Sequence, residues 1–125
     1  MSGASGTPNM YPYQNQPIWS RSEKVIARTV FDSALKRELQ DVIEKAKQMA
    51  NQIKESADVW ELEHYLTERR KEIDRKYDYR YSQLTHVFGR LFYEGRVSED
   101  ELRGLGDDKL KSIRSLAGFL AEYAD

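Results

Sequence analysis

The chain has 125 residues with 20 basic against 21 acidic side chains, and this balance excludes a general attraction to nucleic acid or to anionic membranes. The length fits one small domain, and the absence of cysteine excludes disulfide bonds and thiolate catalysis. Only 39% of the residues are hydrophobic, no apolar run is long enough to cross a membrane, and the N-terminus has no secretory signal pattern, so we expect a soluble cytoplasmic protein that associates to bury apolar surface.

Residues 1–19 are predicted to form a disordered N-terminal tail. They combine glycine and proline with asparagine, glutamine and tyrosine, and they show no apolar period. Tyr11 and Tyr13 could serve as a docking motif, but a tail without a partner is the interpretation that we favour.

A first long helix is predicted to begin at Ser20. Ser20 and Glu23 fit a capping box, in which a hydroxyl and a carboxylate satisfy two open N–H groups of the first turn. No glycine or proline follows until Gly89, and apolar side chains recur with a heptad spacing at Leu35, Leu39, Val42, Ala46, Met49 and Ile53. A helix of roughly 30 residues spans about 45 Å, so this seam needs a partner helix along most of its length.

A second long helix is predicted to run from near Asp58 to Gly95, with room for one bend. The break before it falls at residues 55–57, and Asp58 with Glu61 gives a second capping-box pattern. The apolar residues of this helix form one stripe, at Val59, Leu62, Leu66, Ile73, Tyr77, Leu84, Phe88 and Leu91. Trp60 lies about 120° away from the stripe, which indicates a second surface that another molecule covers.

Residues 81–125 are predicted to form a small helical head. Ser98 fits the start of a short third helix, and the aspartate pair that follows Gly106 fits the cap of a fourth. The fourth helix has an apolar face at Leu110, Ile113, Leu116, Ala117, Leu120 and Tyr123. We expect the two short helices to pack against the C-terminal half of the second long helix. The predicted fold is therefore all-α, with an elongated stem over residues 20–80.

The remaining motifs do not favour catalysis or nucleic-acid binding. Glu61 and His64 have the Glu-x-x-His spacing of di-iron bundles, but His64 lies opposite the apolar stripe, where ligands cannot converge. His86, the other histidine, has no nucleophile or phosphate-binding loop beside it. Basic residues and tyrosines mix between positions 69 and 81, but acids in the same turns nearly cancel the field. We therefore expect no enzyme, cofactor, bound metal or nucleic-acid partner.

Arg70 lies on the shoulder of the apolar stripe, with Asp74 one turn on and Glu63 two turns back. A plain intrahelical ion pair is one interpretation of this spacing. The other is an antiparallel helix interface, in which Glu63 of one chain reaches Arg70 of a second chain. The spacing favours the two interpretations equally.

The stretch from Trp60 to Arg80 resembles the signature of the fluorescence recovery protein family of cyanobacteria. It reads W-x-L-x-x-Y-L-x-x-R-R-x-E-I-D-x-K-Y-D-x-R without a gap. The likeness covers roughly residues 19–116 and continues through Val87, Phe88, Glu94, Gly95, Glu101, Leu102, Asp108, Lys109, Lys111 and Ile113. The resemblance implies a non-enzymatic, all-helical protein that forms a homodimer through its long helices.

The resemblance also implies a function and its partners. Members of this family bind the photoactivated orange carotenoid protein, mainly at its C-terminal domain, and accelerate its return to the inactive orange form. They thereby end photoprotective energy quenching at the phycobilisome, which places them near the thylakoid. By position, the resemblance implies a dimer interface at Trp60 and Arg70, and we add their neighbours Glu63, His64 and Asp74 on the same helix. It also implies a partner-binding region in the head, where we expect His86, Phe88, Lys109 and Ser112 to take part.

The chain departs from the family pattern at a few positions. Between Leu62 and Leu66 it has residues 63–65 as Glu-His-Tyr, where the family usually has His-Asp-Phe. In the head, His86 replaces an aromatic residue and Ser112 replaces a basic one. The alternative function is therefore a helical, dimeric adaptor of the same kind with a different protein partner, in an organism that lacks carotenoid photoprotection.

Overall fold

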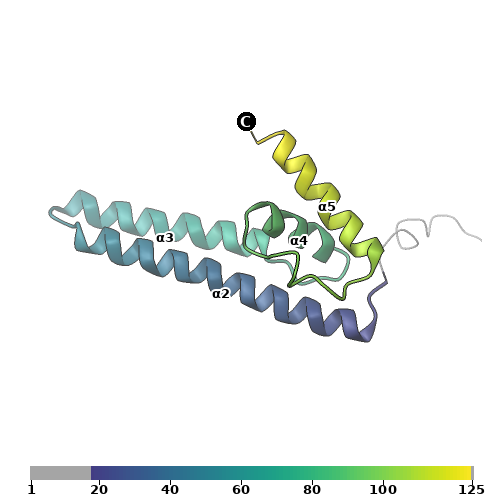
Figure 1. Ribbon diagram of the computed structural model, residues 1–125. Coiled ribbons are helices and arrows are strands. Elements are labelled where there is room, and N and C mark those ends of the chain that lie inside the picture. The colour runs from purple at the N-terminus through teal and green to yellow at the C-terminus, as the bar shows by residue number, and fades with distance from the viewer. Residues whose placement is uncertain (1–17, 125) are drawn as a thin grey trace, which may run out of the picture.

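The computed structural model describes residues 18–124, and over this range the chain forms four α-helices and no β-strand. The helices are α2 (Arg21–Asn51), α3 (Ser56–Lys76), α4 (Leu84–Tyr93) and α5 (Asp107–Glu122). Figure 1 shows α2 and α3 side by side as an elongated stem, α4 against the stem where α3 ends, and α5 leading the C-terminus away from it. The predicted all-α fold of a stem and a head is confirmed. Residues 1–17, with most of the predicted tail, Tyr11 and Tyr13, lie outside the described residues.

The first long helix, α2, begins with the predicted capping box. The N–H of Glu23 donates to Ser20 Oγ at 3.1 Å, and the N–H of Ser20 donates to Glu23 Oε1 at 2.9 Å. Two N–H groups that the first turn leaves open are thus satisfied. The helix then continues for 31 residues, a length of about 46 Å.

The second long helix, α3, begins slightly earlier than its predicted cap. Asp58 was expected to be the N-cap, but it lies inside the first turn and accepts hydrogen bonds from the N–H groups of Lys54 at 2.9 Å and Glu55 at 3.2 Å. The break between the long helices therefore falls at residues 52–55, just before the predicted one.

The second long helix is also shorter than expected, because residues 77–83 leave the helical path before α4 begins. The rings of Tyr77 and Tyr79 turn onto Phe31 of α2, at centroid distances of 5.3 Å and 4.8 Å, and each meets it edge to face. Alternate side chains that face one neighbour are the period of an extended chain. Tyrosine is a weak helix former, so packing on α2 overrides the helical stripe, and the prediction of one continuous helix to Gly95 is wrong.

Gly95 is a helix stop, as predicted, but it ends α4. Its φ is 77°, its N–H donates to the carbonyl of Phe92 at 3.1 Å, and the N–H of Arg96 donates to the carbonyl of Leu91 at 2.8 Å. These two bonds form a Schellman motif, in which a left-handed glycine lets the last turn satisfy its open carbonyls.

The predicted third helix at Ser98 is not formed. Ser98 and Glu101 do exchange capping-box hydrogen bonds, at 2.9 Å and 3.2 Å, but these close only one turn. The chain then turns at Gly104, where φ is 101°. Leu102 and Leu105 are 2% and 5% exposed. A left-handed residue interrupts a right-handed helix, so the segment remains a loop that carries both leucines into the core.

The last helix, α5, takes its cap from another part of the chain. Its N-cap is Gly106, so the predicted aspartate cap is wrong, and Asp107 and Asp108 lie in the first turn. The N–H of Gly106 donates to Glu23 Oε2 of α2 at 2.6 Å. Carboxylates in a first turn are favourable because they face the positive end of the helix dipole.

α5 packs against α4, which is the C-terminal part of the predicted second long helix, as expected. The core of the head also includes side chains from the N-terminal half of α2, which the sequence did not predict. The buried core residues are Trp19, Ala27, Val30, Phe31, Ala34, Leu84, Val87, Phe88, Leu91, Val97, Leu102, Leu105 and Ile113. Trp19, which the sequence placed in the tail, is 6% exposed, and its Nε1–H donates to the carbonyl of Tyr81 at 3.0 Å. A tryptophan ring buries a large apolar area, so Trp19 anchors the start of α2 to the head.

Candidate functional surfaces

The five residues predicted for a dimer interface lie exposed on α3. They are Trp60, Glu63, His64, Arg70 and Asp74, and Trp60 is 66% exposed. Within residues 18–124, none of the charged members forms an ion pair, and Glu63 makes only a hydrogen bond inside its own helix. The plain intrahelical pair of Arg70 is therefore not formed, and its guanidinium faces solvent.

The stem leaves apolar side chains uncovered on both long helices. Leu39 and Ile43 of α2 are 44% and 45% exposed, and Val59 and Leu66 of α3, which were expected inside the apolar stripe, are 40% and 39% exposed. Other residues of the predicted seam, such as Val42, are only half-buried. Two helices alone thus cover their apolar faces in part, which is typical of a stem that meets a further helix.

A buried carboxylate that the sequence analysis missed joins the stem to the head. Glu38 of α2 is 1% exposed. Its oxygens accept hydrogen bonds from Lys76 Nζ at 2.7 Å, from Tyr77 Oη at 2.8 Å and from Arg69 Nη2 at 2.9 Å, and Arg96 Nε lies 3.2 Å away. These groups come from α3, from the segment after α3 and from the loop after α4. The Glu38 side chain therefore joins α2 to three other parts of the chain.

Each cation around Glu38 also reaches a second carboxylate. The three pairs are Arg69–Glu72, Lys76–Glu94 and Arg96–Asp41. Burial alone raises the pKa of Glu38, but the hydrogen bonds from Lys76, Arg69 and Tyr77 outweigh burial and hold that pKa below its ordinary value. Burial and the neighbouring Glu38 carboxylate raise the pKa of Tyr77, so its hydroxyl stays a donor. Glu38 is therefore ionised inside a network of alternating charge.

A second buried ion pair ties the start of α2 to the start of α5. Lys109 is 3% exposed, and its Nζ donates to Glu23 Oε1 at 3.1 Å and to the carbonyl of Ile18. Burial alone raises the pKa of Glu23, but the N–H groups of Ser20 and Gly106 together with Lys109 lower it to about 2. The Glu23 carboxylate thus accepts hydrogen bonds from the N-cap residues of α2 and α5 and from one buried ammonium.

The residues predicted to bind a partner do not gather on one surface of the head. His86 and Ser112 are exposed, but His86 lines a cleft beside α4 and Ser112 lines a separate hollow on α5. Phe88 is fully buried in the core, and Lys109 is buried in its ion pair with Glu23. Phe88 and Lys109 shape the head from inside, and only His86 and Ser112 present atoms to a partner.

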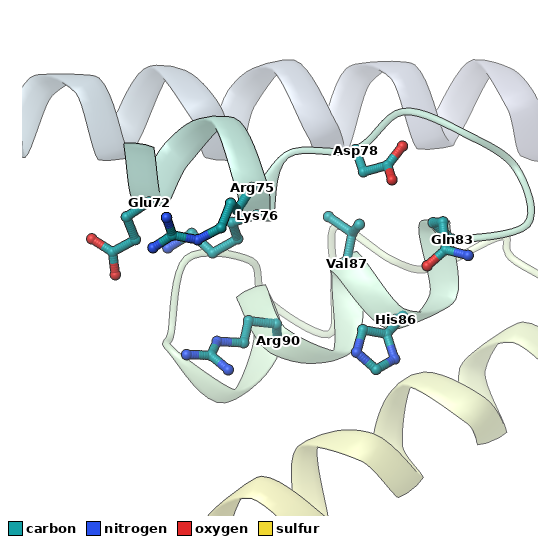
Figure 2. A pocket seen from close by; sticks show the side chains of 8 residues that line it. All are labelled: Glu72, Arg75, Lys76, Asp78, Gln83, His86, Val87 and Arg90. Carbon is teal, nitrogen blue, oxygen red and sulfur yellow. The ribbon is translucent and has the colours of Figure 1, made fainter. Parts of the chain in front are cut away.

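The cleft beside His86 lies between the end of α3 and α4 and has a volume of about 360 Å³. Figure 2 shows Arg75 and Lys76 on the α3 side, with Arg90 and His86 on the α4 side. Lys76 and Arg90 are already paired, since both contact Glu94. Arg75 forms no ion pair within the described range. Arg75, Gln83 and His86 are therefore polar groups that this cleft offers to a partner.

The arrangement is that of a protein-binding module. In residues 18–124, no group of three histidine or acidic side chains is placed to hold a metal ion. Over the same range, every helix is too short or too polar to cross a bilayer. The described chain instead offers exposed aromatic, apolar and charged side chains on a frame that two buried ion networks hold together. These features are typical of a helical protein that acts through contacts with other proteins.

Both the sequence and the fold of the chain match known proteins. The sequence model of the family described as photoprotection regulator fluorescence recovery protein matches residues 19–117. The fluorescence recovery protein of Synechocystis sp. (strain ATCC 27184 / PCC 6803 / Kazusa) is 39% identical over 99 residues, which span 79% of this chain and 91% of that protein. The solved structures from Fremyella diplosiphon and Synechocystis sp. PCC 6803 are 42% and 39% identical, each with a TM-score of 0.77 and with 81% of this chain and 99% of theirs covered. The chain therefore belongs to the fluorescence recovery protein family, a family of photoprotection regulators, and the predicted family is confirmed.

Proposed function

We propose that this chain is a homodimeric regulator of an orange carotenoid protein. It binds the photoactivated form at the C-terminal domain, accelerates the return to the inactive orange form and so ends energy quenching at the phycobilisome. Its place of action is the cytoplasm beside thylakoid-associated phycobilisomes. The observation that carries the proposal is the match of the photoprotection-regulator family to residues 19–117, which is nearly the whole described fold.

Such a regulator works by differential binding. A ligand shifts a conformational equilibrium only as far as its affinities for the two states differ, and it accelerates the change only if it binds the barrier state more tightly than the starting state. The Glu38 network supports this role, because it fixes α4 and the cleft at His86 relative to the stem. A rigid surface spends less binding energy on its own ordering.

The homodimer rests on the exposed surface of α3. Trp60 is a large aromatic side chain at 66% exposure, and Arg70 lies about three turns further along the same helix without an ion pair among the described residues. Tryptophan and arginine are the side chains that most often dominate interface energetics. In an antiparallel pair of α3 helices, Glu63 of one protomer meets Arg70 of the other, with His64 and Asp74 beside them.

Dark recovery of a photoconverted orange carotenoid protein tests this proposal. The protein is illuminated, the chain is added, and the return of the orange absorbance is followed in the dark. We expect the recovery rate to rise with the concentration of the chain, and an unchanged rate at stoichiometric excess would overturn the proposal. His86→Glu should reduce the acceleration because His86 lines the exposed cleft, whereas Lys54→Glu, at the turn between α2 and α3, should not.

An adaptor with a different protein partner is the second candidate. The observation in its favour is that His86 and Ser112 are both exposed, and both depart from the pattern that the family resemblance implies. Substitutions at exposed positions of a binding surface alter which partner it binds. This candidate predicts a dimer in solution but no effect on dark recovery, so the two measurements together distinguish the candidates.

A further inference from the structure

A groove without any acidic lining residue lies at the N-terminal end of α2, and it shares no residue with the surfaces described above. Its lining residues are Arg21, Lys24, Val25, Arg28, Thr29, Tyr79 and Tyr81, and its volume is about 470 Å³. The chain as a whole carries a net charge of −1. The positive charge of the groove is therefore a local feature that the composition does not explain.

The three cations of this groove differ in whether they already form an ion pair. Arg28 forms an ion pair within its own helix at 3.0 Å, and its guanidinium carbon lies 4.1 Å from the ring centre of Tyr79. Lys24 Nζ lies 4.9 Å from the ring centre of Tyr81. Within residues 18–124, neither Arg21 nor Lys24 forms an ion pair. A cation–π contact restrains Lys24 but leaves its N–H donors open, so two cations remain available to an anionic group.

The floor of the groove is fixed before any ligand arrives. Tyr79 packs edge to face on Phe31 at 4.8 Å, and the carbonyl of Tyr81 accepts the hydrogen bond from buried Trp19. The Tyr79 hydroxyl is buried and has no hydrogen-bond partner in the described part of the chain. A preformed floor lowers the entropic cost of binding.

The groove also has an apolar element, and it is not simply an open helix terminus. Val25 is 64% exposed beside the cations. The first turn of α2 already has its capping box, and Glu23, the acid of that turn, faces inward onto Lys109. The basic side chains face solvent, and the acidic one is buried.

We propose that this groove binds an acidic segment of a partner protein. Its carboxylates pair with Arg21 and Lys24, and an apolar side chain of the segment packs on Val25. The surface lies apart from α3 and from the cleft at His86, so the inference goes beyond the proposed function. An exposed valine beside the cations suits a peptide better than a phosphate backbone, and a net charge of −1 gives little long-range attraction for a polyanion.

The chain itself is a poor source of the acidic segment. Residues 1–17 contain no aspartate or glutamate. Figure 1 shows that α5 leads away from α2. A separate partner remains as the donor of the carboxylates.

The probe for this groove is a fluorescein-labelled peptide of alternating glutamate and leucine, titrated with the full chain and followed by fluorescence anisotropy. We expect saturable binding that weakens as salt is raised, because exposed charges are screened. The double variant Arg21→Glu/Lys24→Glu should weaken binding about tenfold or more. Its added carboxylates lie in the first turn of a helix, where the dipole favours them, so the fold and its thermal midpoint should be retained.

The matched control is Lys45→Glu/Lys47→Glu, which makes the same change of charge at exposed positions further along α2. It should alter binding less than about twofold. A second peptide with serine in place of leucine, and the variant Val25→Ser, measure the apolar part, and each should weaken binding.

Four outcomes would overturn the proposal. The first is no saturable binding of the peptide, and the second is an equal loss in the two double variants. The third is tighter binding of single-stranded DNA or phosphatidylserine vesicles that depends on Arg21 and Lys24. The fourth is a halved mass of the Arg21→Glu/Lys24→Glu variant in light scattering with peptide binding intact, since the groove would then be an interface between copies of this chain.

Discussion

The hydroxyl of Tyr77 donates to the buried carboxylate of Glu38 at 2.8 Å, and this bond joins α2 to the residue at which α3 ends. The same tyrosine packs edge to face on Phe31, seven residues before Glu38. One side chain therefore completes both an apolar and a polar contact at the junction of stem and head. The polar contact is the more fragile one, because a buried charge without its partner is costly.

Glu38→Gln should lower the free energy of unfolding by about 3 kcal/mol, because three buried or half-buried cations lose the carboxylate that they share. Urea denaturation followed by circular dichroism measures the change. Glu44→Gln is the matched control, since Glu44 is exposed and, among the described residues, accepts a hydrogen bond only from Gln40. Its effect should stay within about 0.5 kcal/mol. Equal stabilities of the two variants would contradict the role of the network.

The Glu23 carboxylate should make stability depend on pH in the acid range. Its pKa falls from 4.5 to about 2 on folding, so the folded state binds fewer protons than the unfolded state. The stabilisation is therefore complete above pH 4.5 and is lost as the pH falls towards about 2. The thermal midpoint of the chain should exceed that of Glu23→Gln near neutral pH, and the gap should narrow steadily through this window. A gap that stays constant down to about pH 2 would show that Glu23 acts without its charge.

Local signals of the sequence predicted the parts of the fold that depend on neighbouring residues. The capping box of Ser20 and Glu23 was readable because both partners lie within one turn. Gly95 was readable because a left-handed residue after an apolar run is a helix stop. The family motif between Trp60 and Arg80 predicted the candidate dimer surface on α3.

Contacts between residues that are distant in the sequence could not be predicted from such local signals. Residues 77–83 carry a helical stripe, but the spacing of Tyr77, Tyr79 and Tyr81 is also that of an extended segment, and only the position of α2 decides between the two. Glu38 lies four residues after Ala34 and on the same helical face, which was the available signal of its burial. Its partners are 31 to 39 residues away for Arg69, Lys76 and Tyr77.

Gly89→Ala should destabilise the head by about 1–3 kcal/mol, since a methyl group at this position would lie 2.8 Å from Leu116 and push α4 away from α5. Gly118→Ala is the control, because a methyl group there meets nothing within 4 Å. It should be neutral or should stabilise α5 by about 0.5 kcal/mol, as alanine is the better helix former. Thermal unfolding of both variants checks the pair, and equal shifts would contradict the close approach of α4 and α5.

Trp60→Ala and Arg70→Glu should each shift the protein from dimer to monomer. Trp60 is expected to lose its buried contact area, and Arg70→Glu places a like charge against Glu63 of the partner, each at a cost of about 2 kcal/mol or more. Size-exclusion chromatography with light scattering measures the mass. Arg103→Glu makes the same change of charge at a side chain that is 79% exposed in the head, and it should leave the mass unchanged.

A charge swap gives the sharpest test of the antiparallel pairing. Glu63→Arg alone should dissociate the dimer, because it places two arginines together, whereas Glu63→Arg combined with Arg70→Glu restores an ion pair of reversed direction and should restore the dimer. Both positions are exposed and unpaired with any described charge, so neither change should unfold the monomer. If the double variant is as monomeric as its parents, Glu63 and Arg70 do not meet across the interface. If all three variants remain dimeric, the interface does not lie on this face of α3.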